Sequence, residues 1–330
     1  MIHIGINGFG RIGRLTFRRI FERPNLNIVG INDLLPVEHL AYLLKYDSVH
    51  GRFKGTIEVA GNTLIVNNKV IQIFSEKQPE NIPWKQADVD YVIESTGLFT
   101  NKEQAEKHLI GGAKKVVISA PSNNAPMFVM GVNHFNLKKE DVIFSNASCT
   151  TNCIGPIVKV LNENFGIVEG FVNTVHATTA SQNTVDGPED IWRRGRSALN
   201  NMIPTSTNAG KAIVKIMPEL EGKILAMAVR VPTIDVSLVD FTVRLEKATS
   251  YAEIKRAMKK ASENELQGIL GYTEDEVVSQ DFVSEPRISV FDANAGMELS
   301  PNFFKIIAWY DNEFGYATKL VDLIEYSSTL

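Results

Sequence analysis

The sequence predicts an α/β protein of two domains, in which a parallel sheet is followed by a second, α+β domain built on a mainly antiparallel sheet. Its 330 residues exceed the roughly 250 to 300 at which a single core usually stops growing. In the first half, short apolar runs alternate with helical stretches, as is typical of strands buried between two layers of helices. Beyond about residue 150, apolar and polar residues alternate instead, which indicates antiparallel strands with one buried face.

The first half begins with a strand, a helix and a second strand. We expect the helix over residues 12–22, because Phe17, Ile20 and Phe21 share one face and Pro24 ends it. The expected strands cover residues 2–7, 27–33, 89–96, 114–119 and 142–147. Several of them end in small or polar residues, and in parallel sheets a ligand binds beyond the carboxyl ends of the strands.

The second half contains a clear one-face-buried strand over residues 238–245, with apolar residues at 239, 241, 243 and 245 and polar ones between them. Further elements are expected as strands over 171–176, 225–231 and 304–310 and an amphipathic helix over 251–264. A long irregular stretch follows His176 and runs to about residue 201. So long a loop inside a compact domain is more often functional than accidental.

Composition and charge exclude several classes of protein. Hydrophobic residues make up 44% and charged residues 22%, ordinary values for a globular protein, and no apolar run reaches the ~18 residues of a membrane span. The net charge of −4 argues against affinity for nucleic acid or anionic membranes. The first residues lack the features of a secretory leader, so we expect a cytoplasmic protein. The two cysteines, Cys149 and Cys153, fit a reducing compartment and have no histidine pair nearby, so we expect no metal site.

A glycine motif joins the first strand to the first helix. Gly8, Gly10 and Gly13 form the pattern GxGxxG, and Asp33 ends the second strand. The glycines allow a pyrophosphate to approach the N–H groups at the start of the helix. The Asp33 carboxylate can accept hydrogen bonds from both ribose hydroxyls and would repel a 2′-phosphate. The motif predicts a Rossmann-type domain over residues 1–148 that binds NAD rather than NADP; the alternative is three loop glycines and a surface aspartate.

Cys149 is the candidate nucleophile. Apolar residues recur at positions 154, 157, 158 and 161, so we expect a helix to begin at this cysteine. A helix N-terminus and nearby cations lower the pKa of a thiol, which would favour a thiolate near neutral pH. The alternative is a small buried core residue, which suits Cys153, one turn inside the helix, better than Cys149.

His176 is the candidate base for this thiol, since nucleophilic thiols need one. It ends a strand of the second half and opens the long loop, whereas the other histidines lie on or near the first half, where packing or surface roles explain them. A purely structural histidine is the alternative, because the sequence does not show that His176 reaches Cys149.

Arg230 lies in an apolar strand, where a charge is costly unless it is paired. A bound phosphate would pair it, and the alternative is an internal salt bridge to an aspartate. Other groups that suit an anion lie in the same loops: Ser148, Thr150, Thr179, Ser181, Arg196 and Thr207. These residues predict a local phosphate site within an acidic chain.

Together these residues resemble the phosphorylating glyceraldehyde-3-phosphate dehydrogenase family. The similarity runs essentially end to end, through the segments INGFGRIGR, KYDSVHGRF, ESTGLF, GAKKVVISAP, SNASCTTNC, TVHATTASQNTVDGP, RVPT and WYDNEFGY. SNASCTTNC, which contains Cys149, is highly specific.

The resemblance implies a role for each matching residue, with Cys149 as nucleophile and His176 as base. Beside the glycines, the residues that would hold NAD are Arg11, Ile12, Asp33, Lys77, Ser119 and Asn312, the last of them positioning the nicotinamide amide. The substrate phosphate would lie against Thr179, Ser181, Arg196 and Arg230. The attacking inorganic phosphate would lie against Ser148, Thr150, Thr207, Asn208 and Arg230.

Three positions depart from the family's usual pattern. Asn208 stands where the family's STGAAK has glycine, and if that glycine supplies an N–H at positive φ, asparagine can do so at some strain. Ser181 keeps the hydroxyl of the usual threonine, whereas Asn183 removes the charge of a lysine. We expect these changes to alter phosphate affinity rather than the chemistry.

The resemblance implies oxidation of glyceraldehyde 3-phosphate to 1,3-bisphosphoglycerate in glycolysis and gluconeogenesis, with NAD and inorganic phosphate, through a hemithioacetal and a thioester on Cys149. It also implies a homotetramer that braces the long loop, a catalytic domain over residues 149–312, and a C-terminal helix, 313–330, that packs back on the first domain.

Two other functions fit part of the sequence. An erythrose-4-phosphate dehydrogenase tends to lose the TVDGP segment, which this chain retains at 184–188. An NAD-dependent binding or adhesion protein without catalysis is disfavoured by the intact Cys149 and His176.

Overall fold

The computed structural model describes residues 1–330, and the chain divides into two compact units. Unit 1 comprises residues 1–128, 135–147 and 320–330, and unit 2 comprises residues 129–134 and 148–319. The last helix, α8 (Phe314–Ser328), therefore contributes its final turns to unit 1. None of the helices combines the length and the apolar character that crossing a membrane requires.

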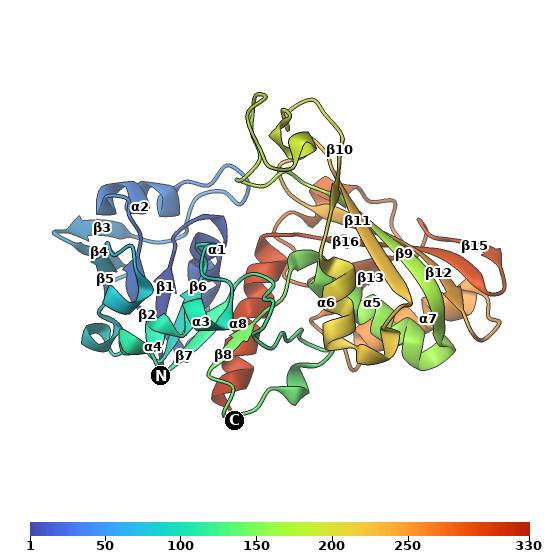
Figure 1. Cartoon of the computed structure of the whole chain (residues 1–330), viewed down its shortest axis with the longest axis horizontal. Helices are drawn as coiled ribbons and strands as arrows, with labels where there is room; N and C mark the ends of the chain where they lie inside the picture. Colours follow the sequence, from blue (N-terminus) through green and yellow to red (C-terminus); the bar gives the residue numbers. More distant parts are fainter. The chain divides into compact units, whose positions relative to one another are not determined.

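Unit 1 is built on an eight-stranded sheet of order β3-β4-β5-β2-β1-β6-β7-β8 (Figure 1). All neighbours from β5 to β8 are parallel, which confirms the Rossmann-type prediction. The predicted strands are β1 (Ile2–Asn7), β2 (Leu26–Asn32), β6 (Tyr91–Glu94), β7 (Lys115–Ile118) and β8 (Ile143–Ser145). The helices and 3-10 turns are α1 (Arg11–Ile20), α2 (Val37–Lys45), η1 (Pro79–Asn81), η2 (Trp84–Ala87), α3 (Lys102–Ala105) and α4 (Lys107–Ile110). A further 3-10 turn, η3 (His134–Asn136), begins in unit 2 and ends in unit 1.

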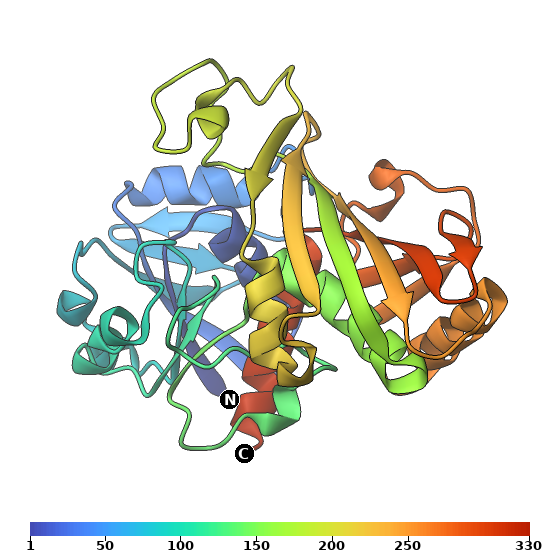
Figure 2. The same ribbon diagram turned by 45° about the vertical axis from the view of Figure 1, so that its right-hand side comes forward.

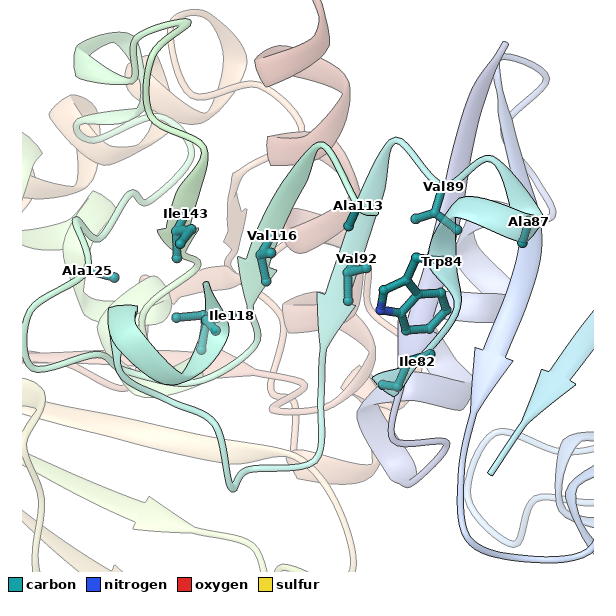
Figure 3. Close-up of a cluster of buried hydrophobic side chains, with 11 residues drawn as sticks. Ile82, Trp84, Ala87, Val89, Val92, Ala113, Val116, Ile118, Ala125 and Ile143 are labelled. Carbon is teal, nitrogen blue, oxygen red and sulfur yellow. The ribbon is translucent and has the colours of Figure 1, made fainter. Parts of the chain in front are cut away.

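Buried side chains from β6, β7 and β8 form one apolar cluster of unit 1 with the loops around them (Figure 3). The indole of Trp84 is fully buried in this cluster and packs edge-on against Phe74. Burial of such large side chains contributes about 1.5 to 3 kcal/mol each. The cluster therefore anchors β6, β7 and β8 to the segments that surround them.

An antiparallel extension of this sheet was not among the predicted elements. It consists of β3 (Ile57–Ala60), β4 (Thr63–Val66) and β5 (Lys69–Phe74), with antiparallel pairing of β3 to β4 and of β4 to β5. Asn67 and Asn68 both have positive φ, 49° and 65°, as a two-residue hairpin turn requires. β3 is largely exposed, so it lacks the buried apolar run by which the parallel strands were found.

Unit 2 is built on a second sheet, of order β10-β11-β9-β12-β16-β14-β13, with β15 paired to β16. The pairs β9–β11 and β13–β14 are parallel and the others antiparallel, which confirms the prediction of a mainly antiparallel sheet. Its strands are β9 (Ile167–His176), β10 (Ile203–Ser206), β11 (Ile224–Arg230), β12 (Ser237–Leu245), β13 (Leu270–Thr273), β14 (Ser289–Asp292), β15 (Met297–Ser300) and β16 (Phe303–Tyr310).

Three helices pack on this sheet, α5 (Cys149–Phe165), α6 (Ala209–Ile216) and α7 (Tyr251–Glu263). The short turns of unit 2 are η4 (Trp192–Gly195), η5 (Pro218–Leu220) and η6 (Ser279–Phe282). Between β9 and β10, residues 177–202 contain only η4, which confirms the long irregular stretch; Figure 2 shows it reaching beyond the end of β9.

Candidate active site

Only glycine fits at two positions where β1 leads into α1, one in the turn and one in the first turn of the helix. Gly8 has a φ of +88°, and a Cβ there would lie 2.8 Å from the backbone nitrogen of Thr96. A Cβ at Gly13 would collide with the carbonyl oxygen of Gly8. Gly10 is the N-cap of α1 and offers no side-chain cap, and the first turn contains no acidic residue. A phosphate group is therefore a suitable partner for the N-terminus of α1.

A cavity of about 500 Å³ opens beside this turn, within unit 1. Its lining combines polar groups with apolar side chains, of which Leu34 and Leu98 are 58% and 70% exposed. The lining residues are Asn7, Gly8, Gly10, Asn32, Asp33, Leu34, Glu76, Lys77, Ser95, Thr96, Leu98 and Phe99. A concave site with apolar walls and a few polar groups fits a dinucleotide such as NAD.

The predicted cofactor residues divide into two groups. Gly8, Gly10, Asp33 and Lys77 line the cavity, whereas Arg11, Ile12, Gly13, Ser119 and Asn312 do not. The sequence analysis did not predict that Leu34, Leu98 and Phe99 line the cavity. The available signals were the position of Leu34 directly after a strand end and the presence of the other two in the segment ESTGLF.

Asp33 is held in place by two backbone N–H groups. Its Oδ2 accepts a hydrogen bond from the N–H of Phe9 at 2.8 Å, and its Oδ1 accepts one from Leu35 at 3.0 Å. The carboxylate lies just beyond the last residue of β2 and lines the cavity. Each oxygen keeps a lone pair for a hydroxyl group, as the role predicted for Asp33 requires.

The side chain of Arg11 is paired with Asp47, at 2.5 Å between Nη1 and Oδ2. Burial alone would raise the pKa of Asp47, but hydrogen bonds from the N–H groups of His50 and Val49, together with Arg11, bring it to about 2. The guanidinium is thus committed to an internal ion pair. Only the backbone of Arg11, in the first turn of α1, remains as the part that suits a phosphate.

In unit 2, α5 begins at Cys149, as predicted, and Ser148 is its N-cap. The Ser148 hydroxyl accepts a hydrogen bond from the N–H of Thr151 at 3.0 Å. The half-buried Cys149 Sγ lies 3.5 Å from Nε2 of His176, the last residue of β9. The structure thus brings the predicted nucleophile within hydrogen-bond reach of the predicted base.

The other ring nitrogen of His176 has two neighbours. Nδ1 lies 2.7 Å from the carbonyl oxygen of Ala177 and 2.5 Å from Nη1 of Arg230, the residue directly opposite His176 in the β9–β11 pair. Arg230 also donates to the Ala177 carbonyl, at 3.0 Å. The carbonyl favours a proton on Nδ1, whereas the guanidinium opposes it. The contacts of Arg230 are thus with His176 and Ala177, and not the salt bridge to an aspartate that the sequence left open.

Burial controls the ionisation of the pair. It raises the pKa of the Cys149 thiol, against the opposite effects of the Arg230 charge and of hydrogen bonds from Thr150. Burial lowers the pKa of His176 to about 3, and the charge of Arg230 acts in the same direction. The direction for Cys149 is opposite to the one expected from the helix N-terminus, because desolvation of the sulfur outweighs the positive groups. Both shifts favour the uncharged forms, a thiol and a neutral imidazole.

Cys153 has the surroundings of a structural residue. It is fully buried, and its thiol donates to the Ser289 hydroxyl at 3.6 Å. Burial raises the pKa of this thiol far above its ordinary value. Cys153 therefore has the burial of a small core residue, as its position in the helix predicted.

Tyr310 contacts residues of the candidate site, and the sequence analysis did not predict it as a site residue. It is fully buried, its ring meets that of His176 edge to face at 6.0 Å, and its hydroxyl lies 3.0 Å from Thr150 Oγ1 and 2.8 Å from Thr174 Oγ1. Asn312, two residues further along the chain, is held by a separate hydrogen bond. Its Oδ1 accepts from the Ser237 hydroxyl at 2.7 Å. Tyr310 lies in the segment WYDNEFGY, which was the only sequence signal for it.

The predicted phosphate residues are only partly brought together. Arg196 forms an ion pair with Asp186 on the surface, at 2.6 Å. Arg194, in contrast, lies near Arg230: burial lowers the pKa of Arg230, and the positive charge of Arg194 lowers it further. Arg194 also donates to Thr205 Oγ1 at 2.8 Å. Sequence reasoning missed Arg194 because the three arginines of this loop cannot be told apart without their contacts.

The remaining hydroxyls and Asn208 have simple local geometry. Thr179 Oγ1 and Ser181 Oγ lie 3.2 Å apart, and Thr207 Oγ1 accepts from the N–H of Ala209 at 3.2 Å. Asn208 is the exposed N-cap of α6 with a φ of −86°. The condition considered for Asn208, a positive φ, is not met, so its backbone carries no strain of that kind.

Comparison with known proteins agrees with both units. Residues 2–102 match the family model described as glyceraldehyde 3-phosphate dehydrogenase, NAD binding domain, and residues 148–312 match the C-terminal domain of the same family. The chain is 57% identical over 327 residues to glyceraldehyde-3-phosphate dehydrogenase 2 of Mucor circinelloides f. lusitanicus, covering 98% of this chain and 97% of that protein. It is 56% identical over 329 residues to glyceraldehyde-3-phosphate dehydrogenase A of Escherichia coli (strain K12), covering 99% of each.

These relatives confirm the predicted resemblance, cofactor and reaction, and they do not favour the erythrose 4-phosphate or non-catalytic alternatives. The matched regions cover the NAD cavity turn as well as Cys149 and His176. The chain therefore belongs to the glyceraldehyde-3-phosphate dehydrogenase family and is an NAD-dependent enzyme that oxidises glyceraldehyde 3-phosphate in glycolysis.

Proposed function

We propose that Cys149 is the nucleophile and His176 the general base of this reaction, and that inorganic phosphate releases the product as 1,3-bisphosphoglycerate. The observation that carries the proposal is the 3.5 Å distance between Cys149 Sγ and His176 Nε2 at the start of a capped helix. Residues 149–312 would form the catalytic domain. Residues 1–148, with 313–330, would form the dinucleotide-binding domain.

The first step is addition of sulfur to the aldehyde. His176, neutral because burial lowers its pKa to about 3, accepts the thiol proton at Nε2 while Sγ forms a bond to the carbonyl carbon. The imidazolium then returns this proton to the new oxyanion, which gives a hemithioacetal. Because the thiol pKa is raised by burial, the proton transfer accompanies attack rather than preceding it.

In the second step, His176 removes the hydroxyl proton of the hemithioacetal and the carbon becomes a thioester. When bound, NAD supplies the acceptor for the hydride that leaves this carbon. An aldehyde has no other leaving group, so the covalent bond to Cys149 is what makes expulsion of hydride possible. The oxidation energy is retained in the thioester.

Phosphate completes the reaction by attacking the thioester carbonyl, and the Cys149 thiolate leaves and recovers its proton from His176. Arg230 would bind phosphate, supported by Arg194, and hydroxyls of Ser148, Thr150, Thr179, Ser181 and Thr207 would surround it together with Asn208. An anion that draws Arg230 away from Nδ1 leaves the Ala177 carbonyl as the partner of Nδ1. The proton then resides on Nδ1 and the lone pair of Nε2 is available to the substrate.

The chain's own residues would hold NAD by separate means. The backbone N–H groups at Gly10, Arg11, Ile12 and Gly13 suit the pyrophosphate, and Asp33 suits the adenosine ribose. Lys77 and Ser119 would complete the site. Asn312, held by Ser237, would hold the nicotinamide amide.

We further propose a cytoplasmic homotetramer. Large apolar side chains are exposed on one face of the unit 2 sheet, with Phe171 at 67% and Leu225 at 66%, and Trp192 projects from the long loop. Monomers rarely expose such patches. Further copies of the chain would cover this face and brace the loop.

Alkylation with iodoacetamide followed by peptide mass mapping tests the site. We expect the label on Cys149 and none on Cys153, and loss of turnover in proportion to labelling. Turnover should require inorganic phosphate and should favour glyceraldehyde 3-phosphate over erythrose 4-phosphate. Labelling of Cys153, or turnover independent of phosphate, would contradict the proposal.

A further inference from the structure

A chain of buried polar groups lies behind the wall of the NAD cavity in unit 1. It runs from Trp84 through His108 and Glu94 to Asn7 and Thr96. Trp84, His108 and Glu94 are at most 1% exposed and do not line the cavity, whereas Asn7 and Thr96 do. Polar groups at this depth are costly unless every one is paired, so the chain has a defined set of partners.

The first link fixes the tautomer of His108. The indole Nε1–H of Trp84, which can only donate, points to His108 Nδ1 at 3.0 Å. Nδ1 is therefore the acceptor, and the ring proton lies on Nε2. Nε2 in turn donates to Glu94 Oε2, also at 3.0 Å.

Glu94 receives donors on both oxygens. Oε2 also accepts from Asn7 Nδ2 at 2.6 Å, and Oε1 accepts from the N–H of Thr96 at 2.8 Å and from its hydroxyl at 2.5 Å. Thr96 Oγ1 accepts in turn from the N–H of Leu98 at 3.1 Å. Glu94 thus holds the wall segment 96–98, whose backbone approaches Gly8 so closely that no Cβ fits between them.

The other arm of the chain orients two amides. Because Asn7 donates to Glu94, its Oδ1 faces the Nδ2 of Asn32, at 2.8 Å. Asn32 Oδ1 then accepts from the N–H of Glu76 at 2.8 Å, next to Lys77. Asn7, Asn32 and Glu76 all line the cavity. The orientation of each amide is set by its neighbour, and the series ends at Glu94.

We propose that Glu94 and His108 are positioning residues for NAD: from behind the cavity they orient Asn7, Asn32 and Thr96 in its wall. Glu94→Gln replaces one carboxylate oxygen, which accepts hydrogen bonds, with an NH₂ group. This NH₂ group would face hydrogen-bond donors. His108→Leu removes one of the donors and leaves the Trp84 N–H without its acceptor. Both changes disorient the wall without altering its lining residues.

The test is calorimetric titration of NAD, combined with steady-state kinetics. We expect Glu94→Gln and His108→Leu to weaken NAD binding about tenfold, the effect of one unpaired buried polar group. The KM for NAD should rise by the same factor, whereas kcat at saturating NAD and the KM for the aldehyde stay within about twofold. His108→Gln keeps an N–H donor toward Glu94 and should restore NAD affinity to within about threefold of the unaltered enzyme.

His3→Gln is the matched control, because His3 belongs to unit 1 and contacts Asp88 outside this chain of groups. It should leave NAD affinity unchanged. Lower melting temperatures with unchanged NAD affinity in Glu94→Gln and His108→Leu would overturn the proposal. Equal loss in His108→Gln and His108→Leu would also overturn it, and this pair decides the matter if Glu94→Gln does not fold.

Discussion

At the scale of single residues, the reactivity of Cys149 depends on the strand pairing that places Arg230 opposite His176. The guanidinium charge favours a thiolate at Cys149 and disfavours an imidazolium at His176. Burial disfavours both ions. In its proposed role as base, His176 therefore stays unprotonated throughout the neutral range, and Arg230 would link its state to the proposed anion site.

Replacement of the sulfur is the most direct test at this scale. Cys149→Ser should lower kcat by at least about 10³-fold, because a serine hydroxyl is a far weaker acid and the neutral imidazole cannot ionise it to a useful extent. Rapid-mixing measurements should show no burst of NADH. Cys153→Ser is the control and should retain kcat; equal loss in both variants would refute the assignment.

His176→Asn keeps a polar side chain but removes the base. We expect kcat to fall by about 10² to 10⁴. Alkylation of Cys149 should become slower at pH 7, and its rate should rise only as the solution pH approaches the raised thiol pKa. The rate of iodoacetamide labelling, measured from pH 6 to 10, gives the profile. Identical profiles for the two proteins would show that His176 does not accept the thiol proton.

The lowered pKa of His176 also makes stability depend on pH. In the unfolded chain the imidazole titrates near 6.5, and in the folded protein near 3, so between these values the unfolded state binds the extra proton. Stability from this group is therefore lost as pH falls from about 6.5 toward 3, with a slope of at most about 1.4 kcal/mol per pH unit. Urea midpoints at pH 7 and 5 should differ less in His176→Asn than in the unaltered protein.

At the scale of elements, two helices begin with serine caps that have different surroundings. Ser148 caps α5 beside the nucleophile, and Ser250 caps α7 through a reciprocal capping box with Glu253. Each accepts a hydrogen bond from an N–H that would otherwise be unpaired in the first turn. The caps have the same physical role, but only Ser148 lies beside the proposed nucleophile.

Ser148→Ala and Ser250→Ala therefore form a matched pair. Each should lower the free energy of unfolding by about 1 kcal/mol through loss of its cap. Only Ser148→Ala should also reduce turnover, because fraying of the first turn moves Cys149 away from His176. Urea denaturation and kcat measure the two effects, and a loss of turnover in Ser250→Ala would contradict this division.

The elements also show which features the sequence could predict. β1, α1 and β2 were predicted because the glycine motif and the buried apolar runs are local signals. The 57–74 hairpin was missed because its first strand is exposed. The direction of the Cys149 pKa shift depends on burial, which only the tertiary structure defines. The choice between Arg194 and Arg196 depends in the same way on partners distant in the sequence.

At the scale of the whole molecule, the exposed apolar face of unit 2 is the main unsatisfied feature. Phe171 and Leu225 are paired across β9 and β11, and Met227, two residues after Leu225 on β11, extends the same patch. Patches of this kind are typical of interfaces between subunits. The chain's net charge of −4 keeps repulsion between copies low.

Phe171→Glu tests the assembly that we propose, because it places a charge at the centre of this patch. Burying an unpaired carboxylate costs several kcal/mol, so we expect sedimentation to show smaller species in place of a tetramer. Turnover should fall as well, since the loop that carries Trp192 would lose its neighbour. Val70→Glu, an equally exposed position on β5 in unit 1, is the control and should leave the assembly intact. If both variants sediment like the unaltered protein, the sheet face of unit 2 is not the interface, and the loop is ordered by the chain itself.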